Sequence, residues 1–293
     1  MNVARRRGNR LGFLIFDLFI SLGVGHAYAL LRFVALYYLL FDRKVRTETR
    51  QYVDAMWNYP SFSKRMILTY KLFLSAGEKL IDLRIWETSV RKVELICDIS
   101  RMKEIVTQGE GLIFFTSHVG NWQLMMRELP NFGVDVAILK RRETNDSVED
   151  FLKIDTREST TRIKIIDAED GFNATISVMR ELATGNIVSI MGDVPYRNSK
   201  IISVDFLGSL IDLPEGPFRL AAACKSPIMI LFAKKTAPCK YLLINEEMDT
   251  HTQAIDGNDV KNDKPRLLAQ KYAATLEAFL IENPFEWTPG GRL

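Results

Sequence analysis

The segment at residues 111–125 reads GLIFFTSHVGNWQLM and passes from an apolar run into a histidine, a glycine, an asparagine and a tryptophan. Short apolar runs rich in β-branched or aromatic residues predict buried strands. Similar runs follow at 134–140, 162–167, 186–193, 227–235 and 240–247. Segments with helical spacing separate most of them, at 121–129, 147–159, 171–184 and 217–226, and a last one covers 265–283. This alternation predicts an α/β sheet.

The overall composition is that of a globular protein with a large core. The 293 residues are 47% hydrophobic and 10% aromatic, and the net charge is only +3. Such a charge does not suggest nucleic-acid binding over the whole surface. The cysteines are Cys97, Cys224 and Cys239, without a CxxC pair, which fits a reducing compartment and argues against a disulfide framework or a zinc site.

The N-terminal region combines positive charge with two apolar runs. Arginines at positions 5, 6, 7 and 10 precede the runs 11–25 and 27–41. Each run contains one charge and is shorter than the roughly 20 apolar residues that a spanning helix needs. We interpret the runs as two helices that embed in or lie on a membrane, with the arginines at its anionic cytoplasmic surface. The alternative is a pair of core helices in a soluble protein.

Three regions follow from these patterns. Residues 1–45 are the N-terminal membrane-associating helices. In residues 46–105, apolar side chains recur at intervals of three and four, which predicts amphipathic helices that pack over the later domain. Residues 106–293 are the α/β domain.

His118 directly follows the predicted strand 111–117 and precedes a predicted helix. In open α/β sheets, reactive groups gather at the carboxyl ends of the strands. Peptide dipoles at a helix N-terminus disfavour the imidazolium, so we expect a neutral ring that can act as a general base. On position alone, a structural role for a lone loop histidine is equally consistent with the sequence.

HVGNWQ, with the apolar strand before it, resembles the His-x4-acid motif of the bacterial lipid A biosynthesis and phosphatidylinositol-mannoside acyltransferases, which belong to the lysophospholipid acyltransferase superfamily. Later blocks are similar to this family in the same order. They are ILKRRETND (138–146), NIVSIMGDVPYR (186–197), SVDFLGSLIDLPEGPFRLAAACKSPIMILFA (203–233) and LEAFLIENPFEW (276–287). The N-terminal arginines and apolar runs resemble the family's membrane anchor.

The resemblance implies a mixed, mostly parallel sheet flanked by helices, and transfer of a fatty acyl group. The donor would be a thioester on acyl carrier protein or coenzyme A, and the acceptor a hydroxyl or amine of a membrane lipid or glycolipid. His118 would be the general base, with backbone N–H groups at the following helix start stabilising the oxyanion. No metal and no bound cofactor would be needed. The site would lie at the cytoplasmic face of the bacterial inner membrane.

One position departs from the family pattern, because the acid five residues after the histidine is Gln123. A neutral amide can orient the ring but gives little charge stabilisation. We expect another carboxylate to take this role, first Asp193 at the end of the strand 186–193, and next Glu215 or Asp205. The alternative is a catalytically weak or inactive relative that binds lipid.

The remaining candidate site residues are predicted to bind substrate. They are Asn121, Arg141, Arg142, Arg197 and Glu215. A guanidinium suits a phosphate or phosphopantetheine because it binds bidentately. Asn121 is also expected to cap and pack the helix, and both arginines at 141–142 are equally consistent with solvated side chains. A hydrolase would need a nucleophile, for which Ser117 and Thr116 are the nearby hydroxyls, without a GxSxG elbow.

Overall fold

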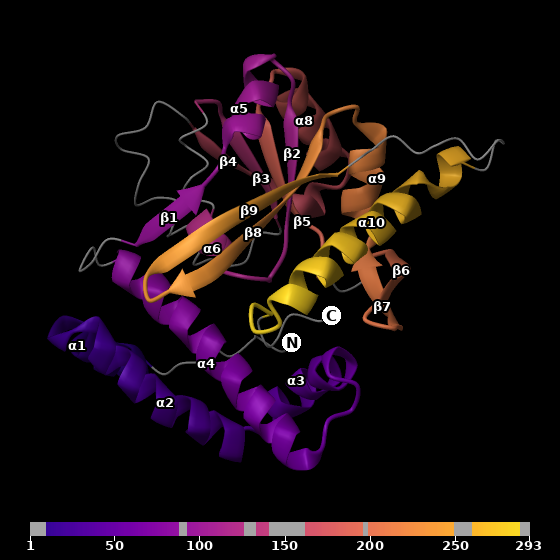
Figure 1. Ribbon diagram of the computed structural model, residues 1–293. Helices are drawn as coiled ribbons and strands as arrows, with labels where there is room; N and C mark the ends of the chain where they lie inside the picture. Colours follow the sequence, from indigo (N-terminus) through magenta and orange to yellow (C-terminus); the bar gives the residue numbers. More distant parts are fainter. Residues whose placement is uncertain are drawn as a thin grey trace.

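The computed structural model describes residues 10–87, 93–125, 133–140, 162–195, 199–248 and 260–287. They form a seven-stranded sheet with helices on both faces, and helices α1 to α4 form a layer below it in Figure 1. The sheet strands are β1 Glu94–Cys97, β2 Leu112–Thr116, β3 Val136–Lys140, β4 Ile163–Asp167, β5 Ile187–Met191, β8 Ile228–Ala237 and β9 Lys240–Met248. A separate hairpin consists of β6 Ile201–Phe206 and β7 Ser209–Pro214. The helices are α1 Arg10–Leu22, α2 Val24–Phe41, α3 Arg43–Met56, α4 Phe62–Glu87, α5 Ser100–Thr107, α6 Trp122–Met125, α8 Phe172–Ala183, α9 Glu215–Ala223 and α10 Val260–Glu282.

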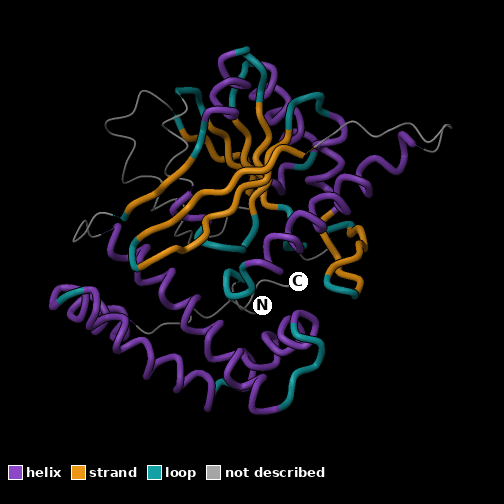
Figure 2. The backbone as a smooth tube through the Cα atoms, viewed as in Figure 1, coloured by secondary structure: helices purple, strands orange, loops and turns teal. Residues whose placement is uncertain are grey.

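The sheet has the strand order β1-β9-β8-β2-β5-β3-β4. Neighbouring strands are parallel except β8 and β9, which pair antiparallel. Figure 2 shows these strands in orange as one twisted sheet with helices around it. The prediction of a mixed, mostly parallel sheet is therefore confirmed. The order places β2 and β5 side by side at the centre, with their carboxyl ends at the same edge.

The central strand β2 is buried on both faces, as its continuous apolar run predicts for a parallel strand. Leu112 and Phe114 belong to a core layer that also contains residues of α4 and α5. Ile113 and Phe115 belong to the opposite layer, with residues of α8, α9 and α10. Each buried phenylalanine stabilises this arrangement by about 1.5–3 kcal/mol. The carboxyl end of β2 is therefore held firmly between two packed layers.

The helix α4 joins the N-terminal layer to the sheet, because it contacts α2 on one side and contributes to both sheet cores. On α2, the buried residues recur every four positions, and they are Ala27, Leu31, Ala35 and Leu39. The rest of α2 points outward, including the exposed Phe33 and Phe41. Within the described ranges, α2 is the one helix that is long and apolar enough to cross a membrane.

Three features differ from the predictions. The range 46–105 is not helical throughout, because β1 pairs there with β9 at the edge of the sheet. Its four residues are too few to show a clear period. The β6–β7 hairpin was not predicted, and α9 begins at Glu215, two residues before the expected Pro217. The predicted helix 147–159 lies outside the described residues, as does the second half of the one at 121–129.

Candidate active site

Two loops meet where β2 and β5 end. Thr116 of β2 lies opposite Met191 of β5 in the parallel register, so each strand is followed by a loop at the same edge. His118 comes two residues after β2, and Asp193 two residues after β5. From β2 the chain continues to β3 on one side, whereas from β5 it leads through the hairpin and α9 to β8 on the other. Such a switch in direction is the usual place for a ligand site in an open α/β sheet.

The structure brings His118 and Asp193 into direct contact. The ring Nδ1 lies 3.1 Å from one carboxylate oxygen of Asp193 and 3.2 Å from the other. The backbone N–H of His118 also donates to this carboxylate, at 2.6 Å. An ionised carboxylate only accepts, so Nδ1 carries the hydrogen and Nε2 keeps a free lone pair. The pair thus has the orientation that a general base requires.

Exposure differs sharply between the two partners. The Asp193 side chain is 3% exposed, whereas the His118 side chain is 36% exposed. The ring is therefore open to an incoming molecule, while the carboxylate that orients it is shielded. The rings of His118 and Trp122 form a T-shaped pair, with 6.3 Å between the ring centroids.

The electrostatics of His118 correct one expectation from the sequence. Burial of the ring lowers its pKa, but the charge of Asp193 and the hydrogen bond to it raise the pKa, and the net value lies above the ordinary 6.5. The expectation of a pKa lowered by the helix dipole is thus wrong in direction, because the adjacent carboxylate outweighs the effect of burial. Proton acceptance by Nε2 consequently becomes more favourable.

The loop after His118 is fixed by two distant segments. Gly120 has φ +71°, and a Cβ at this position would lie 2.3 Å from the carbonyl oxygen of Ala233 in β8. The N–H of Gly120 donates to the carbonyl oxygen of Glu286 at 2.9 Å, and Val119 forms an isolated antiparallel bridge with Trp287. The glycine in HVGNW is therefore required by both its backbone conformation and the close approach of β8.

The chain as a whole matches one protein family. The family model described as bacterial lipid A biosynthesis acyltransferase matches residues 3–288. The chain belongs to this family. A comparison with curated proteins finds no match. Family membership identifies the protein as an acyltransferase, with an acyl donor and a lipid acceptor as its substrates, and it confirms the resemblance seen in the sequence.

The other predicted site residues of this acyltransferase lie in different surroundings. Asn121 is buried, and its side-chain amide donates to the carbonyl oxygen of Lys79 at 3.1 Å and to the Tyr241 hydroxyl at 3.3 Å. This environment suits the packing role better than contact with substrate. Gln123 is partly exposed in the first turn of α6. Ser117 is 1% exposed and its hydroxyl accepts from the N–H of Val119, which does not suit the nucleophile of a hydrolase.

Neither of the other two acids considered in place of Gln123 contacts His118 within the described structure. Glu215 begins α9 and forms an ion pair with Arg219, with 2.6 Å between Oε1 and Nε. Asp205 is an exposed residue of β6 whose backbone exchanges two hydrogen bonds with the side chain of Gln270. The three arginines, at 141, 142 and 197, lie outside the described residues.

The sequence did not predict the residues that hold the end of β2 and the His118 loop in place. The buried hydroxyl of Tyr272 in α10 donates to the carbonyl oxygen of Thr116 at 3.0 Å, and the N–H of Gly192 donates to the same oxygen at 3.2 Å. The carbonyl oxygen of Glu286 holds the His118 loop in place by accepting a hydrogen bond from the N–H of Gly120. The only signal for this role was the closing block ENPFEW, which resembles the family but does not by itself indicate a contact. Among the described residues, no group of three or more His, Cys, Asp or Glu side chains could hold a metal ion.

Proposed function

We propose that the protein transfers a fatty acyl group from a thioester, on acyl carrier protein or coenzyme A, to a hydroxyl or amine of a membrane lipid or glycolipid. The observation that carries this proposal is the accessible His118 ring, oriented by the buried Asp193 at the end of the central strands. Membership of the lipid A acyltransferase family supports the reaction class.

In the proposed reaction, Nε2 of His118 takes the proton from the acceptor hydroxyl or amine as the oxygen or nitrogen attacks the thioester carbonyl. The carbonyl π electrons move to oxygen and form a tetrahedral oxyanion. When this collapses, the C–S bond breaks, and the imidazolium returns its proton to the leaving thiolate. Asp193 holds the ring and stabilises the imidazolium while it exists. The products are an ester or amide and a free thiol, so atoms and charges balance.

The oxyanion needs a hydrogen-bond donor near His118. The N–H groups of residues 119, 120 and 121 already donate to Ser117, Glu286 and Ala233 respectively. We therefore assign this role to the next backbone N–H groups, those of Trp122 and Gln123, in the first turn of α6. In this role the side chain at position 123 does not take part.

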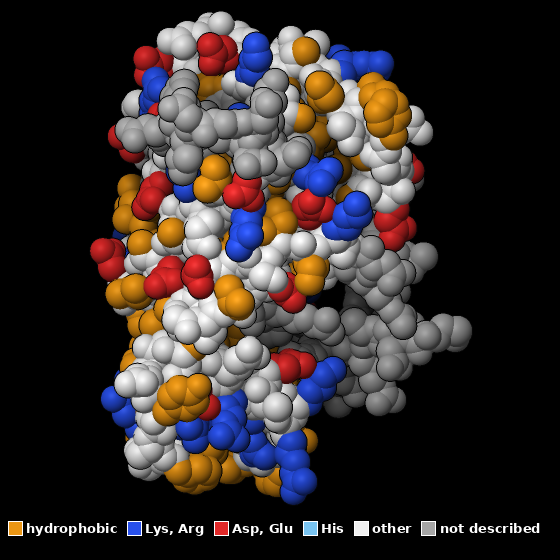
Figure 3. Space-filling view, turned by 90° about the vertical axis from the view of Figure 1, so that its right-hand side faces the viewer, with side chains coloured by type: hydrophobic (Ala, Val, Ile, Leu, Met, Phe, Trp, Pro, Cys, Tyr) orange, Lys and Arg blue, Asp and Glu red, His pale blue; other side chains and the backbone are white. Residues whose placement is uncertain are grey.

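We further propose that the N-terminal layer binds the cytoplasmic face of the bacterial inner membrane. Exposed apolar side chains of α2, among them Phe33, Tyr37 and Phe41, lie on the outer side of this layer. Figure 3 shows basic side chains gathered beside hydrophobic ones at this end of the molecule, where α3 and α4 contribute exposed arginines and lysines. Apolar residues with a basic rim suit an anionic lipid surface.

The test is an assay in which the donors are thioesters of a labelled fatty acyl group with acyl carrier protein or with coenzyme A. The acceptor is a bacterial membrane lipid extract. The wild type is expected to form a labelled lipid from at least one donor. His118→Ala removes the general base and should lower kcat by about 10²–10⁴-fold. The matched control is His26→Ala, which changes an exposed histidine of α2. Equal turnover by His118→Ala and the wild type would refute the mechanism, and free fatty acid without labelled lipid would indicate a hydrolase.

A further inference from the structure

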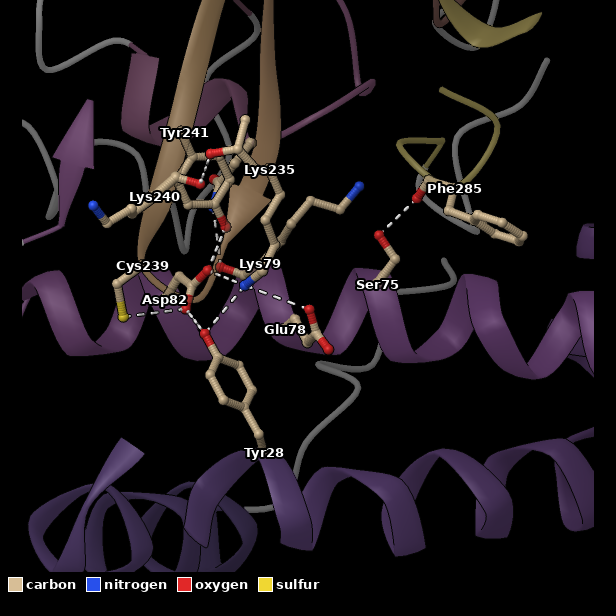
Figure 4. Close-up of polar contacts among 12 residues, drawn as sticks. Tyr28, Ser75, Glu78, Lys79, Asp82, Lys235, Cys239, Lys240, Tyr241 and Phe285 are labelled. Carbon is tan, nitrogen blue, oxygen red and sulfur yellow. Dashed lines mark hydrogen bonds and ion pairs between the residues drawn. The ribbon is translucent and has the colours of Figure 1, made fainter. Parts of the chain in front are cut away.

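A cluster of buried polar side chains lies between the N-terminal helices and the sheet (Figure 4). Its centre is Asp82 of α4, which is fully buried. The carboxylate accepts hydrogen bonds from the hydroxyl groups of Tyr28 in α2 and Tyr241 in β9, the latter at 2.6 Å, and forms an ion pair with Nζ of Lys235 in β8. The same Nζ lies 3.1 Å from the Tyr28 hydroxyl. We call these four residues the Asp82 cluster.

Stability alone does not account for the Asp82 cluster. Transferring a carboxylate and an ammonium group from water into a protein interior is costly, and well-packed apolar residues of similar volume often serve as well or better. The side chain of Lys235 is only 10% exposed. Buried polar groups of this kind are best known for specifying one geometry rather than for adding stability. The relevant question is therefore which geometry the cluster specifies.

The first connection from the cluster leads to the His118 loop through Tyr241. Its hydroxyl donates to Asp82 and accepts a hydrogen bond from the side-chain amide of Asn121 at 3.3 Å. Asn121 is three residues after His118, and its own N–H donates to Ala233 of β8 at 3.0 Å. The Asp82–Tyr241–Asn121 chain thus reaches the backbone of the loop.

A second connection runs through Lys79, which lies about one helical turn before Asp82 in α4. Nζ of Lys79, itself buried, donates to the carbonyl oxygen of Glu286 at 2.7 Å, the same oxygen that accepts from the N–H of Gly120. The Glu286 carboxylate lies 3.3 Å from Nζ of Lys79 and accepts from the backbone N–H of Lys235 at 2.9 Å. The cluster and the loop are therefore joined at two successive residues, 120 and 121.

We propose that Tyr241, held by Asp82 and Lys235, is a positioning residue that fixes Asn121 and thereby keeps the His118 ring against Asp193. Tyr28 extends this support to the apolar helix α2, so the seating of α2 and the geometry of the base are linked through hydrogen bonds. This inference rests on the proposed role of His118 as the base.

The charged groups near His118 and near Asp82 determine the direction in which the pKa of His118 should change. Among the described residues, Asp193 is the charged side chain in contact with His118. The ionisable groups in the Asp82 cluster and around it are Tyr28, Glu78, Lys79, Asp82, Lys235, Cys239 and Tyr241. Burial of the ring lowers the pKa of His118 and the carboxylate of Asp193 raises it, so a displacement that lengthens the contact between Nδ1 and the carboxylate without exposing the ring lowers that pKa. Tyr241→Phe removes the hydroxyl without changing any charge at neutral pH.

The experiment combines NMR titration of the His118 ring with steady-state kinetics on the full-length protein. The chain has three histidines, so His118 can be assigned from His118→Ala. Tyr241→Phe is expected to lower the His118 pKa and to reduce kcat about tenfold, because displaced reacting groups slow a reaction strongly, with KM values little changed. Tyr28→Phe should also lower the His118 pKa and kcat, but by smaller amounts.

The matched control is Tyr70→Phe, which removes another hydroxyl between α4 and α2, one that donates to the carbonyl oxygen of Arg32 outside the cluster. It should leave the His118 pKa and kcat unchanged. An unchanged His118 pKa in folded Tyr241→Phe and Tyr28→Phe would overturn the positioning role, even if activity fell with the folded fraction. The proposed function is tested separately, and it fails if His118→Ala turns over like the wild type. The NMR titration of His118 does not depend on turnover, so the two failures can be told apart.

Discussion

Asp193 places a carboxylate against Nδ1 of His118, and we propose that it takes the role of the acid that the motif around His118 lacks. In the family pattern the acid lies five residues after the histidine, where this chain has Gln123. Here a carboxylate from a different strand end contacts Nδ1 and also accepts the N–H of His118 itself. The pair is built by the parallel pairing of β2 and β5 rather than by spacing within one loop and helix. In the proposed mechanism, a glutamine at position 123 is therefore compatible with an active enzyme.

This arrangement predicts that substitution of Asp193 and of Gln123 will affect kcat differently. Asp193→Asn keeps the shape but removes the charge that stabilises the imidazolium, and it should lower kcat by no more than the roughly 10²–10⁴-fold expected for His118→Ala, because Asp193 acts through the ring. Gln123→Glu, the matched change at the motif position, should leave kcat near that of the wild type. The measurement is steady-state acyl transfer by each variant at saturating substrate. A large gain in Gln123→Glu would show that Asp193 does not fill the role of the acid.

At the scale of elements, the loop between β2 and α6 depends on close contact with β8 and the C-terminal segment. Gly120→Ala would place a methyl group against the carbonyl oxygen of Ala233 and strain a backbone with φ +71°. We expect a loss of unfolding free energy of about 1–3 kcal/mol and a fall in kcat, measured by thermal unfolding and acyl transfer.

The matched control is Gly208→Ala in the β6–β7 turn. Its φ is +73°, but no atom lies within 4 Å of the added Cβ. The control therefore measures the backbone strain alone, and it should destabilise the protein less and leave kcat unchanged. Equal effects of the two substitutions on stability and activity would contradict the packing argument for the His118 loop.

The elements differ in how far the sequence predicts them. The strands 111–117 and 186–193 were predicted because both faces of a central parallel strand are apolar, and this also pointed to Asp193 at the shared edge. The β6–β7 hairpin was missed because Leu207 adopts a positive φ of 48° beside Gly208, a turn without the usual Asn-Gly or Asp-Gly signal. The Asp82 cluster could not be predicted, since Asp82 and Tyr241 are 159 residues apart and only the fold brings them together.

At the scale of the whole molecule, the apolar outer side of α2 should carry the membrane interaction. The triple substitution Phe33→Ser, Tyr37→Ser and Phe41→Ser changes exposed side chains and leaves the packing against α4 intact. We expect it to reduce co-flotation with vesicles that contain anionic phospholipid, because burial of each side chain in the lipid interface is lost.

The control for this prediction is Phe172→Ser with Met179→Ser, which removes exposed apolar side chains from α8, at the opposite end of the molecule from the N-terminal layer (Figure 1). These substitutions should leave flotation unchanged. If the α2 variant floats as well as the wild type and the control does not, the membrane surface lies on the other side of the molecule.

The dependence of kcat/KM on pH tests the His118–Asp193 pair most directly. Only the neutral ring accepts a proton, so activity should rise with pH through the pKa of His118. We predict a midpoint above 6.5 in the wild type, because Asp193 raises this pKa, and a lower midpoint in the residual activity of Asp193→Asn. The same midpoint in both proteins would contradict the account.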